Sequence, residues 1–168
     1  MFHTIHVLRL SLAISLLLVP VSSTSAQAAA EKGPERRLLE RALALLPQRV
    51  TVPVRLIDPD LAADPDAIRR LDAFLVRERD GRIRQVIYLN RRSSVVENAM
   101  RGRAIDIAIL AAVIRHEQEH LGGADEQQAR LAERDFFQGL MLAGHVPVDE
   151  AMAYLDVLRK HHRLREGP

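Results

Sequence analysis

The chain contains no cysteine among its 168 residues, so neither a disulfide nor a lipid attached to cysteine can stabilise or anchor it. Aromatic residues make up only 4% of the sequence, which argues against a base-stacking surface for nucleic acid. The formal net charge is +2, and acidic residues are interspersed among the basic ones without a basic block. We therefore expect no nucleic-acid partner and a fold stabilised by its hydrophobic core alone.

The sequence also lacks an apolar run of the roughly 20 residues that a membrane-spanning helix needs. Its N-terminal apolar run covers residues 10–19, follows Arg9, and leads into an A-x-A pattern at 26–28. This layout predicts a secretory signal peptide over residues 1–28, cleaved near Ala28, rather than an uncleaved anchor. Residues 29–168 would then form one exported domain, periplasmic or secreted, with no membrane span left after cleavage.

Hydrophobic periodicity and turn residues predict an α+β fold, with a small antiparallel sheet beside a helical C-terminal half. A strand is expected over residues 49–57, at a sheet edge because Pro53 cannot donate to a ladder. A hairpin is expected over residues 73–89, around a two-residue turn at Asp80-Gly81. Helices are expected over residues 34–46, 64–71, 94–100, 104–121, 126–143 and 147–161.

The most informative stretch is the HExxH pattern from His116 to His120, which follows the apolar run 104–114. On a helix, these two histidines lie four residues apart on one face, so both imidazoles can bind one Zn²⁺. Glu117 lies about 100° round the helix, where its carboxylate can reach a water molecule beside the metal. The pattern therefore predicts a zinc site in which Glu117 is the general base.

A carboxylate six residues after the second histidine completes the predicted site. Two glycines at 122–123 interrupt the helix, and Asp125 is the expected N-cap of the next one. This corner can fold the second helix back over the first and bring Glu126 beside the histidine pair. Two histidines, a glutamate and one open position form a usual ligand set of catalytic zinc. Asp125 is an alternative ligand, and Asp125 and Glu133 are candidates for supporting the ligands through hydrogen bonds.

The segment resembles the gluzincin metallopeptidases, which carry HExxH on one helix and a zinc-binding Glu, often in Glu-x-x-Ala, on a following helix. Here that pattern is Glu126-Gln127-Gln128-Ala129. The resemblance covers roughly residues 83–140 and implies one zinc ion as cofactor and a peptide or protein as substrate. It also implies that the strand before the HExxH helix pairs with an extended substrate. The candidate residues for that strand are Val86, Ile87, Tyr88 and Leu89.

One position departs from the gluzincin pattern. Some members place an Asp directly after the Ala to orient a zinc histidine, whereas this chain has Arg130. Glu133 or Asp106 is the expected replacement for that acid. A stripe of residues on the second helix, which includes Glu133, is expected to face the first helix. Its members are Glu126, Ala129, Arg130, Glu133 and Phe137.

The segment is also similar to the metzincin pattern HExxHxxGxxH, with Glu126 in place of the last histidine. A metzincin needs a methionine turn beneath the metal, but Met141 and Met152 both lie within helical patterns. The gluzincin topology is therefore favoured, and both topologies assign the same three ligands.

Tyr154 and His145 are candidates for stabilising an oxyanion, as a Tyr or His does in many zinc peptidases. The chain is small for a peptidase, with little sequence beyond the two zinc helices to form substrate pockets. The alternative function is a non-catalytic exported scaffold, zinc-binding or metal-free, that binds a partner. A third hypothesis is a helical module in which the HExxH pattern arose by chance. The sequence does not predict an oligomeric state.

Overall fold

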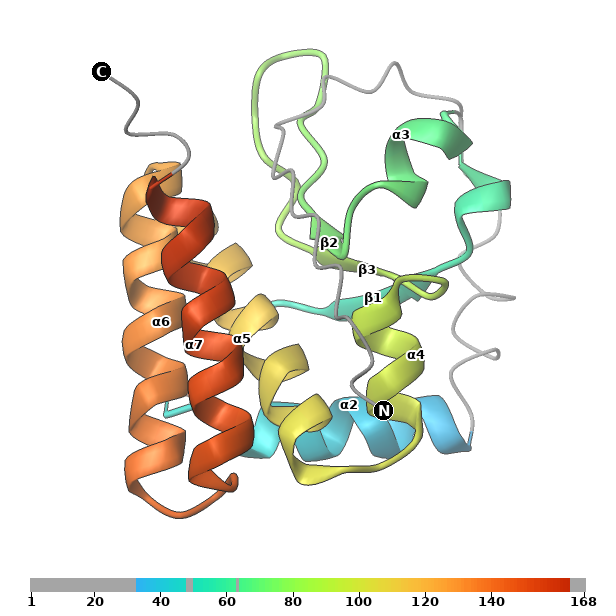
Figure 1. Cartoon of the computed structure of the whole chain (residues 1–168). Coiled ribbons are helices and arrows are strands. Elements are labelled where there is room, and N and C mark those ends of the chain that lie inside the picture. The colour runs from blue at the N-terminus through green and yellow to red at the C-terminus, as the bar shows by residue number, and fades with distance from the viewer. Residues whose placement is uncertain (1–32, 48–49, 63, 164–168) are drawn as a thin grey trace.

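The computed structural model of the protein describes residues 33–47, 50–62 and 64–163, and the predicted signal peptide lies outside them. Within these residues, six α-helices and a three-stranded sheet form an α+β fold, which confirms the predicted class (Figure 1). No helix in this part of the chain combines the length and the apolar character needed to cross a membrane.

All six α-helices lie where the sequence predicted them, with ends shifted by a few residues. Asp64, Ser93 and Asp125 each cap a helix by accepting the backbone N–H three residues further on. These capping signals are local, which explains the agreement. The helices are α2 (Pro34–Ala44), α3 (Pro65–Arg69), α4 (Ser94–Met100), α5 (Ala104–Leu121), α6 (Glu126–Leu142) and α7 (Val148–Arg163), with a 3₁₀ turn η1 (Pro59–Leu61) before α3.

The sheet is mixed, which corrects the prediction of an antiparallel sheet. Its order is β1-β3-β2, with β1 (Val54–Ile57) parallel to β3 (Ile87–Asn90) and β2 (Ala73–Phe74) antiparallel to it. The direction of β1 depends on how the chain crosses over through η1 and α3, and hydrophobic alternation does not report this. The strand predicted over residues 49–57 is shorter than expected, since β1 begins at Val54, directly after Pro53. Its predicted edge position is confirmed, because β1 lies at one edge of the sheet.

The hairpin between β2 and β3 forms as predicted, but its turn has three residues rather than two. Glu78 and Arg82 close the loop, since the Glu78 N–H donates to the Arg82 carbonyl. Gly81 has a φ of 84°, the left-handed conformation that ends a common three-residue hairpin loop. Arg84 N–H donates to the Val76 carbonyl, so the two arms stay paired beyond the ends of β2 and β3.

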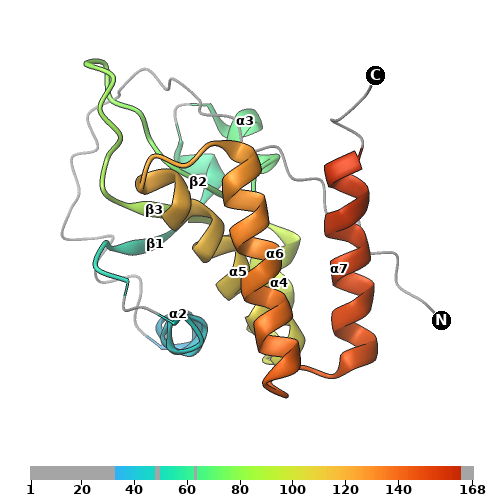
Figure 2. The ribbon, with the colours of Figure 1, turned by 90° about the vertical axis from the view of Figure 1, so that its left-hand side faces the viewer.

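Helix α5 lies at the centre of the core. It contacts α2 and α4, strands β2 and β3, and helix α6, which packs beside α7 on its other flank (Figures 1 and 2). Its middle, residues 107–114, is buried all round, as expected of a helix that is apolar on every face. The HExxH pattern lies in the last two turns of this helix, so the core fixes its position.

Helix α6 returns along α5 after a tight corner. Gly123 adopts a φ of 91°, a left-handed conformation that allows the chain to turn between the two helices. Ala129, Glu133 and Phe137 on α6 are buried, and α6 contacts α5 more extensively than any other element. The predicted stripe therefore faces α5, and its small Ala129 lies at the interface.

Candidate metal centre

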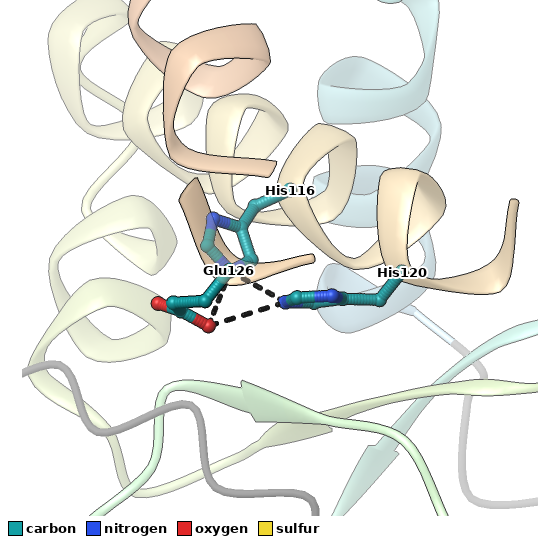
Figure 3. A group of neighbouring side chains, drawn as sticks. All are labelled: His116, His120 and Glu126. Atoms are coloured by element: carbon teal, nitrogen blue, oxygen red, sulfur yellow. Dashed lines mark hydrogen bonds and ion pairs between the residues drawn. The ribbon is translucent and has the colours of Figure 1, made fainter. Parts of the chain in front are cut away.

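Three potential ligand atoms meet where the end of α5 faces the start of α6 (Figure 3). His116 Nε2 lies 3.1 Å from His120 Nε2, which lies 3.3 Å from Glu126 Oε2. The third separation, from His116 Nε2 to Glu126 Oε2, is 3.8 Å. Ligands at 2.0–2.2 Å from a tetrahedral metal ion are separated by about 3.3–3.6 Å. His116, His120 and Glu126, here called the metal triad, therefore have nearly the spacing of three corners around one ion.

In each imidazole of the triad, the hydrogen bond made by Nδ1 indicates that Nε2 is the nitrogen that faces the other two residues. His116 Nδ1 lies 3.1 Å from Glu133 Oε2, and His120 Nδ1 lies 3.0 Å from the Ala124 carbonyl oxygen. A carboxylate and a carbonyl accept hydrogen bonds, so a neutral imidazole in either place carries its proton on Nδ1. Both Nε2 lone pairs then point at each other and at a carboxylate oxygen. Such an arrangement needs a cation, either a shared proton or a metal ion, between the three atoms.

The carboxylate of Glu126 contacts the histidines with one oxygen and Arg130 with the other. Its Oε2 faces the histidines, while its Oε1 accepts a hydrogen bond of 2.6 Å from Arg130 Nε. Burial would raise the pKa of this carboxyl group, but hydrogen bonds with His116, His120 and Arg130 outweigh it and hold the pKa well below its ordinary value. The contact with Glu126 in turn raises the pKa of His120.

The residue that supports His116 is Glu133, one of the candidates named from the sequence. Its side chain is 1% exposed, and its second oxygen, Oε1, accepts a hydrogen bond of 2.8 Å from the Tyr154 hydroxyl. Asp106, the other candidate, lies in the first turn of α5 and pairs with Arg103. It is ten residues from His116 on the same helix, about 15 Å along the axis, and so does not reach the triad.

Asp125 has one of the roles that the sequence suggested for it, the N-cap of α6. Its carboxylate accepts the Gln128 backbone N–H, and the Gln128 side chain accepts the Asp125 N–H, which forms a capping box at the start of α6. The prediction of Asp125 as a cap is therefore confirmed. Its prediction as a metal ligand or as a support for the ligands is wrong, because the carboxylate points to its own helix.

A pocket of about 360 Å³ opens beside the triad. Glu117, which is only 4% exposed, lines it together with two members of the triad. The hairpin forms the facing wall with mainly apolar side chains, so the carboxylate of Glu117 and the triad border a partly apolar space. The lining residues are Ala73, Phe74, Leu75, Arg77, Ile83, Glu117, His120, Gly123, Ala124 and Glu126.

The strand proposed to pair with an extended substrate is wrong. β3, with the preceding Val86, was the candidate, but β3 is the central strand, paired with β1 on one side and β2 on the other. Ile87 and Leu89 are fully buried, and Tyr88 stacks on Phe74. A strand whose two edges are both occupied cannot accept another. The sequence could not show this, because strand order is a property of the assembled sheet.

The sheet edge that borders the pocket belongs to β2 and the residues that continue it. Backbone groups alternate along an antiparallel strand, so every second residue bonds to the partner strand. The carbonyls of Asp72 and Val76 accept N–H groups from the β3 arm of the hairpin. The alternate residues therefore direct their backbone N–H and C=O groups away from β3. Those that line the pocket, here called the pocket edge, are Ala73, Leu75 and Arg77.

Neither residue proposed to stabilise an oxyanion borders the pocket. The Tyr154 hydroxyl donates to Glu133, and the side chain is 3% exposed between α6 and α7. His145 is exposed in the turn after α6, at the opposite end of this 17-residue helix from Glu126, about 25 Å away along its axis. Both predictions are therefore wrong. The length of α6 separates His145 from the pocket, and the packing of α7 directs the Tyr154 hydroxyl to Glu133, behind the triad.

Comparisons of the chain with protein-family models, with curated proteins and with solved structures give no match. The resemblances to gluzincins and metzincins therefore stay predictions.

Proposed function

We propose that the protein is an exported zinc metallopeptidase in which His116, His120 and Glu126 hold the metal and Glu117 is the general base. The observation that supports this function most directly is that the three ligand atoms lie 3.1–3.8 Å apart beside a pocket that Glu117 also lines. Ligands and a candidate base bordering one space are what metal-assisted hydrolysis requires.

The charges around the triad fit a divalent cation. Glu117, Glu126 and Glu133 lie around the two histidines, and Arg130 is bonded to Glu126. With the carboxyl groups ionised, these four residues carry two net negative charges, which one divalent ion balances. Two imidazole nitrogens with a carboxylate oxygen favour zinc over magnesium or calcium, which prefer oxygen ligands alone.

In this proposal the metal triad, Glu117 and the pocket edge each have a separate role in the reaction. Zinc at the triad would lower the pKa of a water molecule and polarise the carbonyl group of the substrate. Glu117 would take a proton from that water and pass it to the leaving amine nitrogen. The pocket edge would bind an extended peptide through backbone hydrogen bonds, and Phe74 and Ile83 would contact its side chains.

Glu117→Gln tests this function, because glutamine has nearly the same size as glutamate but cannot take the proton. We expect the variant to bind zinc stoichiometrically, as the wild type does, and to cleave casein or a peptide library about 10²–10⁴-fold more slowly. Glu119→Gln is the matched control. Glu119 lies on the same helix but pairs with Arg115, so its substitution should leave cleavage unchanged.

Three results would contradict the proposal. Equal cleavage by wild type and Glu117→Gln would remove Glu117 as the base, and a folded, unchelated wild type without zinc would remove the metal site. Stoichiometric zinc without cleavage of any peptide would favour the non-catalytic scaffold instead. The two-residue length of β2 is the observation that favours this alternative, since a short strand offers little edge for a substrate.

A further inference from the structure

Glu133 and Tyr154 form a buried connection from the last helix to the metal triad. We propose that they are positioning residues that set the metal affinity of the triad through His116, so that α7 is a functional part of the site. This inference rests on the proposed metal site but not on peptide hydrolysis.

The two oxygens of Glu133 contact two different helices. Oε2 lies 3.1 Å from His116 Nδ1 on α5, and Oε1 accepts the hydroxyl of Tyr154 on α7 at 2.8 Å. A buried carboxylate needs hydrogen-bond donors, and these two donors fix its rotation about the side-chain axis. A fixed carboxylate in turn fixes the plane of the His116 ring and therefore the direction of its Nε2 lone pair.

The position of the Tyr154 hydroxyl depends on how α7 packs. The Tyr154 ring packs on Phe137 of α6, with ring centroids 4.5 Å apart. An ion pair between Arg103 and Glu150 joins the start of α5 to the start of α7. Because Ala151 and Leu155 beside Tyr154 are also buried, the helix has little freedom to shift the hydroxyl. The packing of α7 therefore decides where Glu133 is held.

The other two ligands are supported from within the α5–α6 corner. His120 bonds to the Ala124 carbonyl oxygen, a backbone group, and Glu126 bonds to Arg130 one turn along its own helix. Of the three ligands, His116 is supported through a connection that reaches a third helix. Removal of one hydroxyl on α7 is therefore expected to weaken metal binding at a ligand on α5.

The test measures zinc affinity by competition with a chelator of known affinity. We expect Glu133→Gln to lower the affinity about 10–100-fold, the usual effect of removing a partner of a metal-binding histidine. Tyr154→Phe keeps the ring packing and should lower it by a smaller factor, about 3–10-fold. The double variant should bind zinc as weakly as Glu133→Gln alone, because Tyr154 acts through Glu133.

Two control variants match these substitutions. Tyr88→Phe removes the hydroxyl of the other tyrosine in the chain, whose partner is Arg84, and Glu119→Gln neutralises an acid on α5. Both should bind zinc as the wild type does. Melting temperatures of the metal-free proteins separate a loss of folding from a loss of affinity. If Glu133→Gln does not fold, Tyr154→Phe compared with Tyr88→Phe decides the question.

The outcomes separate this inference from the proposed function. Unchanged zinc affinity in both Tyr154→Phe and Glu133→Gln would overturn it, and so would a Tyr154→Phe effect that persists undiminished in the double variant. Absence of zinc binding in the wild type would overturn both proposals. Weakened zinc binding in the variants of a protein that cleaves no peptide would support the positioning role and overturn only the peptidase.

Discussion

Ala129→Leu tests whether the close approach of α6 to α5 brings the metal triad together. Ala129 is completely buried and lies three residues after Glu126, on the face of α6 that meets α5. Leucine adds three carbon atoms at a position that is completely buried, and overpacking of this kind costs about 1–3 kcal/mol of the free energy of unfolding. In a domain of this size, 1 kcal/mol shifts the melting temperature by about 4 °C, so we expect a fall of about 4–12 °C.

The same substitution should weaken zinc binding. The ligand atoms are already 3.1–3.8 Å apart, and metal-ligand distances tolerate a change of only about 0.2 Å. A leucine at position 129 would push the start of α6 outward and carry Glu126 Oε2 with it. We therefore expect a zinc affinity at least about tenfold lower, while the two histidines stay in place on α5.

Thermal melting of the metal-free protein and chelator competition measure the two effects separately. Gln127→Leu is the control, because it places the same side chain on the exposed face of α6 and should change stability by less than about 0.5 kcal/mol. A normal melting temperature for Ala129→Leu would refute the tight packing of α6 on α5. A lowered melting temperature with unchanged zinc affinity would refute Glu126 as a ligand held by that packing.

Three further predictions concern the metal, pH and the backbone. Zinc at 100 times its dissociation constant should stabilise the protein by about 2.7 kcal/mol and raise its melting temperature by about 10 °C. In a variant with alanine at all three positions of the metal triad, zinc should leave the melting temperature unchanged. In chelator-treated protein, the pKa of His120 is raised, mainly by Glu126, and the pKa of Glu126 is lowered because His116, His120 and Arg130 outweigh its burial. The stability that His120 contributes is complete below its ordinary pKa of 6.5 and is lost as pH rises through the raised pKa. The stability that Glu126 contributes is complete above its ordinary pKa of 4.5. Denaturation in urea should therefore show maximal stability between pH 4.5 and 6.5 and a decline above pH 6.5. A flat profile from pH 6 to 9 would contradict this. Gly139→Ala should stabilise the protein by about 0.5–1 kcal/mol in the same assay, because nothing lies within 4 Å of a Cβ at this exposed helical position, and a loss of stability would contradict the open surroundings.

The helices and two of the candidate ligands could be predicted because their signals are short-range. A capping side chain acts three residues away, as Ser93 does at α4, and two histidines four residues apart share a helix face in any protein. Glu126 needed one more condition, a sharp corner after α5, and Gly123 supplied it. Each of these features is decided by neighbours within about one or two helical turns, so the sequence carries them directly.

The residues that contact the triad from behind and the pocket edge could not be predicted in the same way. Tyr154 lies 21 residues after Glu133, and no spacing rule connects them, because their contact depends on α7 packing against α6. The pocket edge depends on β3 taking the centre of the sheet, which leaves β2 at the rim. The sequence named β3 as the substrate strand because it precedes the HExxH helix, but order along the chain does not decide order in a sheet.

Local signals in the sequence are enough to give the helices, the HExxH face and the chemical type of the three candidate ligands, since hydrophobic period, capping and residue type act over short distances. Which of their atoms meet depends instead on how the helices and strands pack in three dimensions. This packing brings Glu126 Oε2 within 3.8 Å of both imidazoles and directs Tyr154 to Glu133 rather than into the pocket. It also places the pocket edge, which begins in β2, in the same pocket lining as Glu117. These contacts follow from how helices and strands pack against one another, and such packing is fixed by the whole core rather than by any one segment.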